Sequence, residues 1–237
     1  IRRLLAHEQV GEWEIAILPL PSNRDAQASF GVPGNLAPAL KGACSIERSS
    51  PIDLLLCNGR VVLGTIITGN VWGLHSNRME EHFWRRLRET LSHLGSLRLE
   101  PYTITTAKGT AQDLAAMGIL VFGHHFAGTS ATAISEAILP NDGKLTALVL
   151  SPTSVMSHLW FLIKFRLLRR IALKDLPDSV GFVRTNALTI SGRKHVEVTL
   201  DGERVEAGGL AIEVRNDAAN VVVGRRFREI DDELGNA

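Results

Sequence analysis

The sequence has 237 residues, of which 45% are hydrophobic and 22% are charged, proportions that are ordinary for a folded globular protein. A formal net charge of +1 excludes binding to nucleic acid through the charge of the whole chain. No run approaches the roughly 18 apolar residues that span a bilayer, and no signal-peptide pattern is present. Cys44 and Cys57 have neither metal-type spacing nor the pattern of a disulfide framework, which favours a reducing, cytoplasmic setting.

The first 45 residues are typical of an α/β domain. Residues 1–9 have the pattern of the end of a helix, and Glu14–Leu20 is an apolar run that predicts a buried parallel strand. Polar turn formers, a short helical stretch and a Gly/Pro break at residues 31–34 follow. This alternation predicts the C-terminal part of a three-layer domain. Because the chain opens at Ile1 in the middle of a pattern, we expect the rest of that domain to precede it.

From about Ile46 the sequence changes to short β-branched runs separated by turn formers such as Asn58-Gly59. Many short strands at this spacing predict a β-sandwich or a barrel-like pair of sheets. We expect this domain to span residues 46–224. We expect the tail over residues 225–237 to form a helix that packs back on the first domain. The expected strands are 52–57, 61–68, 102–106, 119–122, 145–150, 187–191, 196–200, 210–214 and 221–223.

Two helices interrupt these strands. The first, over about 78–94, gathers its apolar residues on one face, which is typical of a scaffold helix. The second, over about 154–173, places Arg166, Arg169 and Arg170 opposite a broad apolar face. Such a helix either packs on the sheet with solvated arginines or lies on an anionic membrane surface, and the sequence leaves both interpretations open.

The C-terminal half carries a resemblance to a known family. Residues 140–145 (Pro-Asn-Asp-Gly-Lys-Leu) precede an apolar strand, and residues 198–203 (Val-Thr-Leu-Asp-Gly-Glu) precede two more. This order and spacing is similar to the C-terminal domain of bacterial diacylglycerol kinases and of the related sphingosine and ceramide kinases. The resemblance implies the remnant of an α/β nucleotide-binding domain packed on a large β-sandwich, an architecture that NAD kinases share.

The N-terminal segment extends this resemblance. Residues 15–20 resemble the strand that closes the family's nucleotide site, and the next five match its Gly-Thr-x-Asn-Asp turn only at Ser22 and Asp25, whereas Pro21 and Arg24 depart from it. The family binds ATP phosphates with a Gly-Gly-Asp-Gly-Thr loop, which we expect upstream of the sequence given. Its glycines let backbone N–H groups approach the phosphate oxygens.

The resemblance also implies roles for individual side chains. Glu203 would act as the base for the lipid hydroxyl, Ser22 would contact the nucleotide, and Asp25 and Asp53 would lie near a catalytic Mg²⁺. Asp142 would hold a structural Mg²⁺ together with two main-chain carbonyls, those of Leu139 and Lys144, a ligand set that suits a hard cation. The alternatives are an ordinary hairpin at Glu203, a turn without metal at Asp142 and a solvated turn residue at Asp25.

A second candidate metal pair, His124-His125, is disfavoured because neighbouring residues of a strand point to opposite faces. The resemblance implies ATP-dependent phosphorylation of a lipid hydroxyl such as that of diacylglycerol, with ATP and Mg²⁺ as cofactors. The implied partners are a lipid substrate and a membrane surface rather than nucleic acid, and a homodimer stays open. The rival hypothesis is a lipid-binding module that has lost catalysis, which the departures at Pro21 and Arg24 favour.

Overall fold

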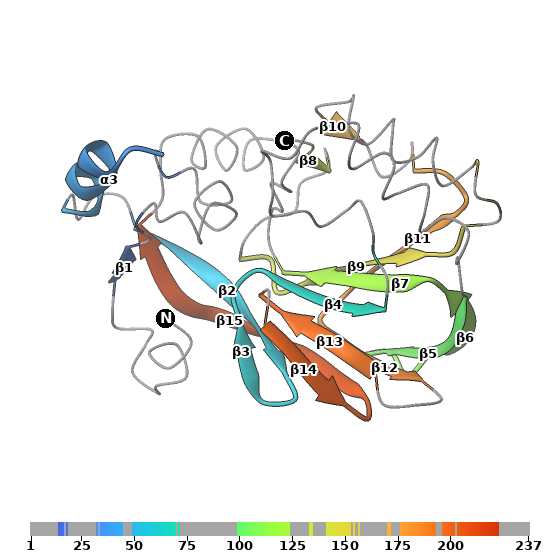
Figure 1. The fold of residues 1–237 in the computed structure, drawn as a ribbon. Coiled ribbons are helices and arrows are strands. Elements are labelled where there is room, and N and C mark those ends of the chain that lie inside the picture. Colours follow the sequence, from blue (N-terminus) through green and yellow to red (C-terminus); the bar gives the residue numbers. More distant parts are fainter. Residues whose placement is uncertain are drawn as a thin grey trace.

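Two β-sheets lie face to face in the centre of the molecule (Figure 1), which confirms the predicted β-sandwich. The sheets belong to a computed structural model of the chain. It describes residues 14–16, 18, 32, 34–44, 49–69, 71, 99–123, 133–134, 141–152, 154, 156, 170–171, 176–192, 196–201 and 203–222.

The first sheet, called sheet A, has the strand order β3-β2-β15-β12-β5-β6, and β1 joins it by pairing in parallel with β15. All other neighbouring strands of sheet A pair in the antiparallel direction. Asn58 and Gly59 close the β2–β3 hairpin with φ of 49° and 76°, the left-handed conformation that two-residue hairpin turns require. The strands are β1 (Glu14–Ala16), β2 (Ser49–Cys57), β3 (Arg60–Val62), β5 (Glu100–Thr106), β6 (Ala111–Ala116), β12 (Ala187–Gly192) and β15 (Leu210–Val222).

The second sheet, called sheet B, has the order β11-β9-β7-β4-β13-β14, and all its neighbouring strands are antiparallel. A separate small sheet pairs β8 with β10 in parallel. The strands of sheet B are β4 (Thr65–Gly69), β7 (Gly118–Phe122), β9 (Leu145–Leu150), β11 (Val180–Thr185), β13 (Val196–Leu200) and β14 (Glu203–Ala207), and the small sheet consists of β8 (Ala133–Ile134) and β10 (Arg170–Ile171).

Alternating side chains fill the space between sheets A and B. On β2, Leu55 and Cys57 belong to this central cluster, whereas Ile52 and Leu54 belong to a cluster on the outer face of sheet A. Successive residues of a strand point to opposite faces, so Asp53 lies on the face of β2 that is turned toward sheet B. Each fully buried Leu or Ile contributes about 1.5–3 kcal/mol to folding, which fixes the alternation and therefore the direction of Asp53.

Two irregularities lie close to one another in this sandwich. Between β3 and β4 the chain crosses from sheet A to sheet B in two residues, Leu63 and Gly64. In β15, Arg215 pairs with Leu54 and Ala219 pairs with Ile52, so residues 216–218 lie opposite Asp53 alone. This β-bulge bends the strand and frees backbone N–H groups from the ladder.

Several strands agree with the sequence-based prediction, and others correct it. The strands expected over 145–150 and 196–200 have those bounds in the structure. The run 61–68 is two strands in two different sheets, because Gly64 lies where the chain crosses between them. The two runs over 210–214 and 221–223 belong to one strand that continues through the bulge to Val222. Five strands of the described residues were not predicted: β6, β8, β10, β11 and β14.

Two helical predictions and one strand prediction need correction in the described residues. The helix expected over 154–173 does not reach its predicted end, because Arg170 and Ile171 form β10, where β-branched Ile171 pairs with Ile134 of β8. Helix α3 (Leu36–Ala43) was not predicted, because it follows a Gly/Pro break and contains Pro38 in its first turn, where proline is tolerated. The strand expected to be buried over 14–20 begins as β1, which is parallel as predicted but has Glu14 and Ala16 exposed. The helix expected over 78–94 lies outside the described residues.

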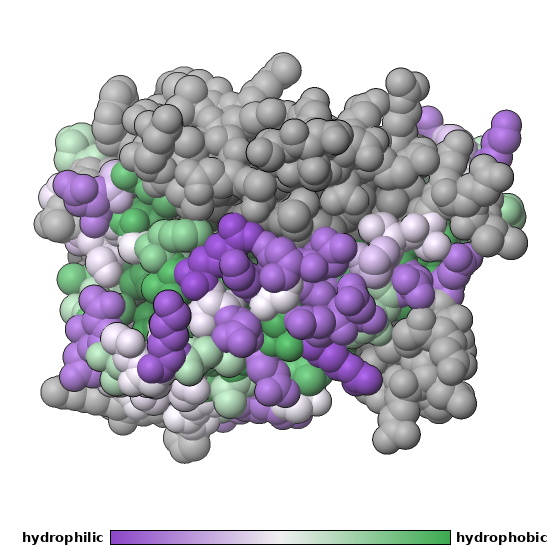
Figure 2. Space-filling view, turned by 180° about the vertical axis from the view of Figure 1, so that it is seen from behind, coloured by the Kyte–Doolittle hydropathy of each residue, from purple (hydrophilic) through white to green (hydrophobic). Residues whose placement is uncertain are grey.

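The described surface is mixed in polarity. Seen from behind, hydrophilic residues gather in the middle of the molecule, with apolar residues between and beside them (Figure 2). Large apolar side chains that are exposed include Leu36 and Leu40, one turn apart on α3. Within the described residues, no helix combines the length and the apolar character needed to cross a membrane.

Candidate functional site

The register of sheet B brings two Asp-Gly turns to the same end of the sheet. The turn over residues 141–144 leads into β9, and the turn at Asp201 leaves β13. Strand spacing is about 4.8 Å, so the three strand-to-strand steps from β13 to β9 place the turns roughly 14 Å apart along the sheet end. One row of paired residues crosses the sheet near this end, and Asp201 follows its first member directly, whereas the other turn ends three residues before its last member. The row consists of Leu200, Ile66, Val121 and Ala147.

Asp201 holds the crossing between the two sheets. Its Oδ2 accepts a hydrogen bond from the N–H of Leu63 at 2.9 Å, and its Oδ1 accepts from the N–H groups of Gly64 and Thr65 at 2.7 and 2.9 Å. The N–H of Asp201 itself donates to the carbonyl of Thr65 at 2.9 Å. A side chain at Gly64 would come within 3.1 Å of Asp201 Oδ1. Glycine therefore lets the carboxylate approach the backbone here. These hydrogen bonds, called the Asp201 clamp, fix the position at which β14 begins.

Glu203 is the first residue of β14 and pairs directly with Leu200 of β13. Residues paired in this way present their side chains on the same face, and Leu200 belongs to the cluster between the sheets. Glu203 therefore faces sheet A, but at the strand end, where the residue is exposed. An exposed carboxylate at the mouth of the space between two sheets is accessible to a substrate hydroxyl.

Asp53 enters the same end of the sandwich from sheet A. The residue is only 2% exposed, its Oδ2 accepts from the N–H of Gly143 at 2.6 Å, and its Oδ1 accepts from the N–H of Asp217 at 2.9 Å. Both donors lie at positions of positive φ, 68° and 46°. Burial raises the pKa of Asp53, and the nearby carboxylates of Asp217 and Asp142 act in the same direction, while the two backbone donors oppose them. Asp53 thus ties β2 to both the Asp142 turn and the bulge of β15.

Asp142 is held by partners of its own. Its Oδ1 accepts from the N–H of Lys144 at 2.9 Å, and its Oδ2 forms a hydrogen-bonded ion pair with Nη2 of Arg184 on β11. A divalent cation at Oδ2 would lie beside the guanidinium, where like charges about 4 Å apart repel by on the order of 4 kcal/mol per unit charge at an effective dielectric constant of 20. The contacts of Asp142 therefore do not fit a Mg²⁺ ligand. No group of three or more His, Cys, Asp or Glu in the described part of the chain is arranged to hold a metal ion.

Asp53 also fits a metal poorly as it stands, because both of its oxygens accept backbone hydrogen bonds and the side chain is buried. The assignment of Asp53 to a catalytic Mg²⁺ stays a prediction. The other predicted residues, Ser22, Asp25 and Leu139, lie outside the described residues. The same is true of the disfavoured pair His124-His125.

The structure adds residues to which the sequence analysis assigned no role. Arg184 pairs with Asp142, Asp201 clamps the sheet crossing, and Asp217 donates its N–H to Asp53. The Asp-Gly pattern at 201–202 gave a signal for a turn, but nothing in the sequence indicated the partners of its carboxylate. Cys57 has no role in this chemistry, because burial raises the pKa of its thiol to about 11 and keeps it protonated.

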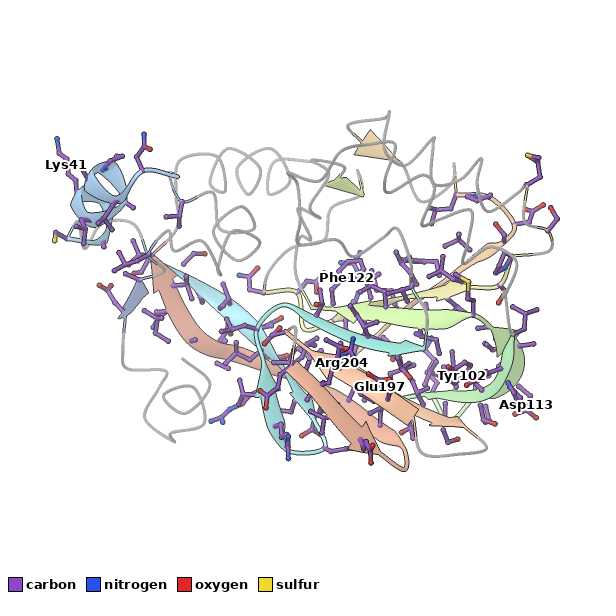
Figure 3. The ribbon with its side chains drawn as sticks, viewed as in Figure 1. Lys41, Tyr102, Asp113, Phe122, Glu197 and Arg204 are labelled. Carbon is purple, nitrogen blue, oxygen red and sulfur yellow. The ribbon has the colours of Figure 1, made fainter. Side chains whose placement is uncertain are left out.

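An open groove elsewhere on the molecule is separate from this site. It lies over β5, β6 and β12, and its lining includes Tyr102, Asp113 and Ser191. Tyr102 and Asp113 lie at one end of the molecule, opposite the end that carries Lys41 on α3 (Figure 3). None of the predicted site residues is among its lining residues, two of which are joined by a 2.6 Å hydrogen bond from Thr103 Oγ1 to Asp113 Oδ1.

The arrangement of the two sheets is similar to that of known structures. One from Bacillus anthracis str. Sterne, described as a candidate diacylglycerol kinase, matches with a TM-score of 0.66 at 19% identity, over 92% of this chain and 73% of that one. The chain has a diacylglycerol-kinase-like fold. Two further structures from the same organism, a diacylglycerol kinase and another candidate, match with TM-scores of 0.59 and 0.62 at 18% and 21% identity, over 87% and 86% of this chain. No family model and no curated protein matches the sequence.

The diacylglycerol-kinase-like fold confirms the architecture that the sequence motifs implied. The chain spans 73%, 65% and 67% of the lengths of the three structures. At such low identity the likeness concerns the fold, and the domain boundaries at 45/46 and 224/225 stay predictions. Within this fold, Glu203 and Asp53 occupy facing sheets at one end of the sandwich.

Proposed function

We propose that the natural protein is a lipid kinase that transfers the γ-phosphoryl group of ATP to the hydroxyl group of a lipid such as diacylglycerol. The observation that carries this proposal is the placement of Glu203. It is an exposed carboxylate on a strand whose start is fixed by the Asp201 clamp, and it faces the space between the two sheets. The diacylglycerol-kinase-like fold supports the reaction class.

In the proposed reaction, the Glu203 carboxylate accepts the proton of the lipid hydroxyl while the hydroxyl oxygen attacks the γ-phosphorus. The bond between the γ-phosphorus and the bridging oxygen breaks, and ADP leaves. Mg²⁺ carried with the nucleotide would neutralise the phosphate charge. Asp25 and Ser22, next to the nucleotide by resemblance, complete the predicted set, and Asp53 holds in place the turn before β9 and the bulge of β15.

The lipid itself would come from a membrane surface. We propose that Arg166 and Arg169, which the sequence places opposite an apolar face, contact anionic headgroups at about 1 kcal/mol for each arginine. Arg170 is part of β10 and so does not extend that helical face.

The test is a comparison of two carboxylates on one strand, measured in the natural protein with any residues that flank this chain. Glu203→Gln keeps the shape and removes the basicity, so lipid phosphorylation should fall by at least about 10²-fold. Glu206→Gln is the matched control, because Glu206 is exposed on the same strand but lies three residues away on the other face. Its activity should stay within a few-fold of wild type.

Two outcomes would contradict the proposal in different ways. Normal turnover by Glu203→Gln would remove this residue from the mechanism. A wild-type protein that binds diacylglycerol, sphingosine or ceramide but phosphorylates none of them would favour the lipid-binding module instead. Nucleotide binding, measured in parallel, should be the same in wild type and both variants.

A further inference from the structure

The Asp142–Arg184 pair has the position at which the family resemblance implies a structural cation. Arg184 lies on β11 opposite Thr146 of β9, and its guanidinium reaches the turn that leads into β9. The side chains are 27% exposed for Arg184 and 13% exposed for Asp142, so the pair is partly shielded from water. Such a pair is held more firmly than an ion pair on the open surface.

The neighbourhood of this pair is acidic. The carboxylates of Asp142 and Asp217 each lie close enough to that of Asp53 to interact with it electrostatically. Backbone N–H groups satisfy Asp53, whereas Asp142 receives one N–H from Lys144 and the guanidinium of Arg184. A partly buried carboxylate next to another carboxylate is stabilised by a positive charge, and at this turn the guanidinium of Arg184 supplies one.

A guanidinium and a divalent cation can each neutralise the charge of the Asp142 carboxylate. Both are positive, and both bind carboxylate oxygens strongly. Binding of both at the same oxygen is unfavourable, because the guanidinium and the cation repel one another. A guanidinium stays protonated throughout the physiological pH range and remains attached to the fold, so the turn would need no ion from solution.

We propose that Arg184 replaces a divalent cation at the Asp142 turn, so that guanidinium and metal are mutually exclusive partners of this carboxylate. The chain then carries its own counter-ion at this end of the sandwich and folds there without Mg²⁺. The inference concerns the structural role of one turn and is independent of whether the protein phosphorylates lipids. Removing the guanidinium should open a cation site at Asp142.

The experiment measures thermal unfolding midpoints in millimolar Mg²⁺ and in chelator, at matched ionic strength. The wild type should have the same midpoint in both conditions. Arg184→Met, which keeps an unbranched side chain without the charge, should unfold several degrees lower in chelator and recover part of that loss in Mg²⁺. The double variant Asp142→Asn/Arg184→Met should lose the recovery.

Arg204→Met is the matched control, because Arg204 forms an ion pair with Glu197 at 3.3 Å on the exposed face of β13 and β14. Its midpoint should be independent of Mg²⁺. A wild-type midpoint that rises in Mg²⁺, and that stops rising in Asp142→Asn, would overturn the proposal, and so would an Arg184→Met variant that Mg²⁺ does not rescue.

A direct binding measurement covers the case in which Arg184→Met does not fold. Mn²⁺, a paramagnetic substitute for Mg²⁺, is titrated into the wild type and into Asp142→Asn. Equal binding by the two proteins supports the replacement, since Asp142 is then occupied by Arg184. Binding to wild type that Asp142→Asn abolishes overturns it.

Discussion

The two Asp-Gly turns at one end of sheet B use the same dipeptide in different ways. Asp201 accepts three backbone N–H groups from the segment that crosses between the sheets. Asp142 instead pairs with the side chain of Arg184. Backbone donors are present whatever the sequence of the crossing segment, whereas the partner of Asp142 depends on one residue of β11. The turn motif therefore determines local geometry, and the tertiary structure determines what the carboxylate does.

The largest effect is expected at the Asp201 turn. Asp201→Ala leaves the three N–H groups of residues 63–65 without their charged acceptor, and hydrogen bonds to charged groups contribute about 1.5–3 kcal/mol each. We expect a loss on the order of 4 kcal/mol in the free energy of unfolding, measured in denaturant. Glu213→Ala, on an exposed position of β15, is the control. A loss below about 1 kcal/mol would show that the crossing holds its shape without the clamp.

A smaller effect is expected from Asp53→Asn, which removes a charged acceptor from the Asp142 turn and so tests the other half of the comparison. The amide keeps one acceptor and turns an NH₂ toward either Gly143 or Asp217, so we expect a loss of about 2 kcal/mol at neutral pH. The pKa of Asp53 is raised above its ordinary value of 3.8 when the protein folds. In the window above that value the folded state holds more protons than the unfolded state, so the contribution of Asp53 to stability falls as pH rises.

The difference in stability between wild type and Asp53→Asn should therefore widen as the pH is lowered toward 3.8. Denaturant unfolding at a series of pH values measures it. Asp113→Asn, at the exposed end of sheet A, is the acid-to-amide control. A difference that narrows on acidification would contradict the raised pKa.

The smallest effect is expected for a pair of charges on the open surface. Glu197 and Arg204 lie on neighbouring strands (Figure 3), and their side chains are 65% and 80% exposed. Arg204→Gln should change the free energy of unfolding by less than about 1 kcal/mol, and salt should reduce even that. A larger loss of unfolding free energy would mean that the exposed fraction of the side chains does not predict the strength of an ion pair in this protein, including the Asp142–Arg184 pair.

Much of the fold could be predicted because its central strands carry a strong signal. The runs over 145–150 and 196–200 are apolar or alternate regularly, and both were predicted with the bounds that the structure shows. The edge strands β6 and β14 were missed because their residues, Ala-Gln-Asp-Leu-Ala-Ala and Glu-Arg-Val-Glu-Ala, are small or charged. Edge strands tolerate such residues, and strand propensity depends on that context.

The site could be predicted in part. The Asp-Gly signals located both turns, and Glu203 and Asp53 do lie on facing sheets. The contacts that distinguish the turns could not be predicted, because they join distant parts of the chain. Asp201 binds residues up to 138 positions away, and Asp142 binds a residue 42 positions away. Such pairings follow from strand order, which a single sequence does not reveal.

The order of the strands in sheet A has a consequence for biosynthesis. Ser49 of β2 pairs with Val222, and Glu14 of β1 pairs with Asn220, so the inner part of this sheet joins the two ends of the chain. Four central strands of sheet B can pair earlier, since β4, β7, β9 and β11 are arranged in the sheet in the same order in which they are synthesised. A growing polypeptide can therefore pair those strands while β2 still lacks β15, and long-range pairing of this kind is slow. During translation, the apolar strand β2 therefore lacks one of its two neighbours until β15, the last strand of the sandwich, has been synthesised.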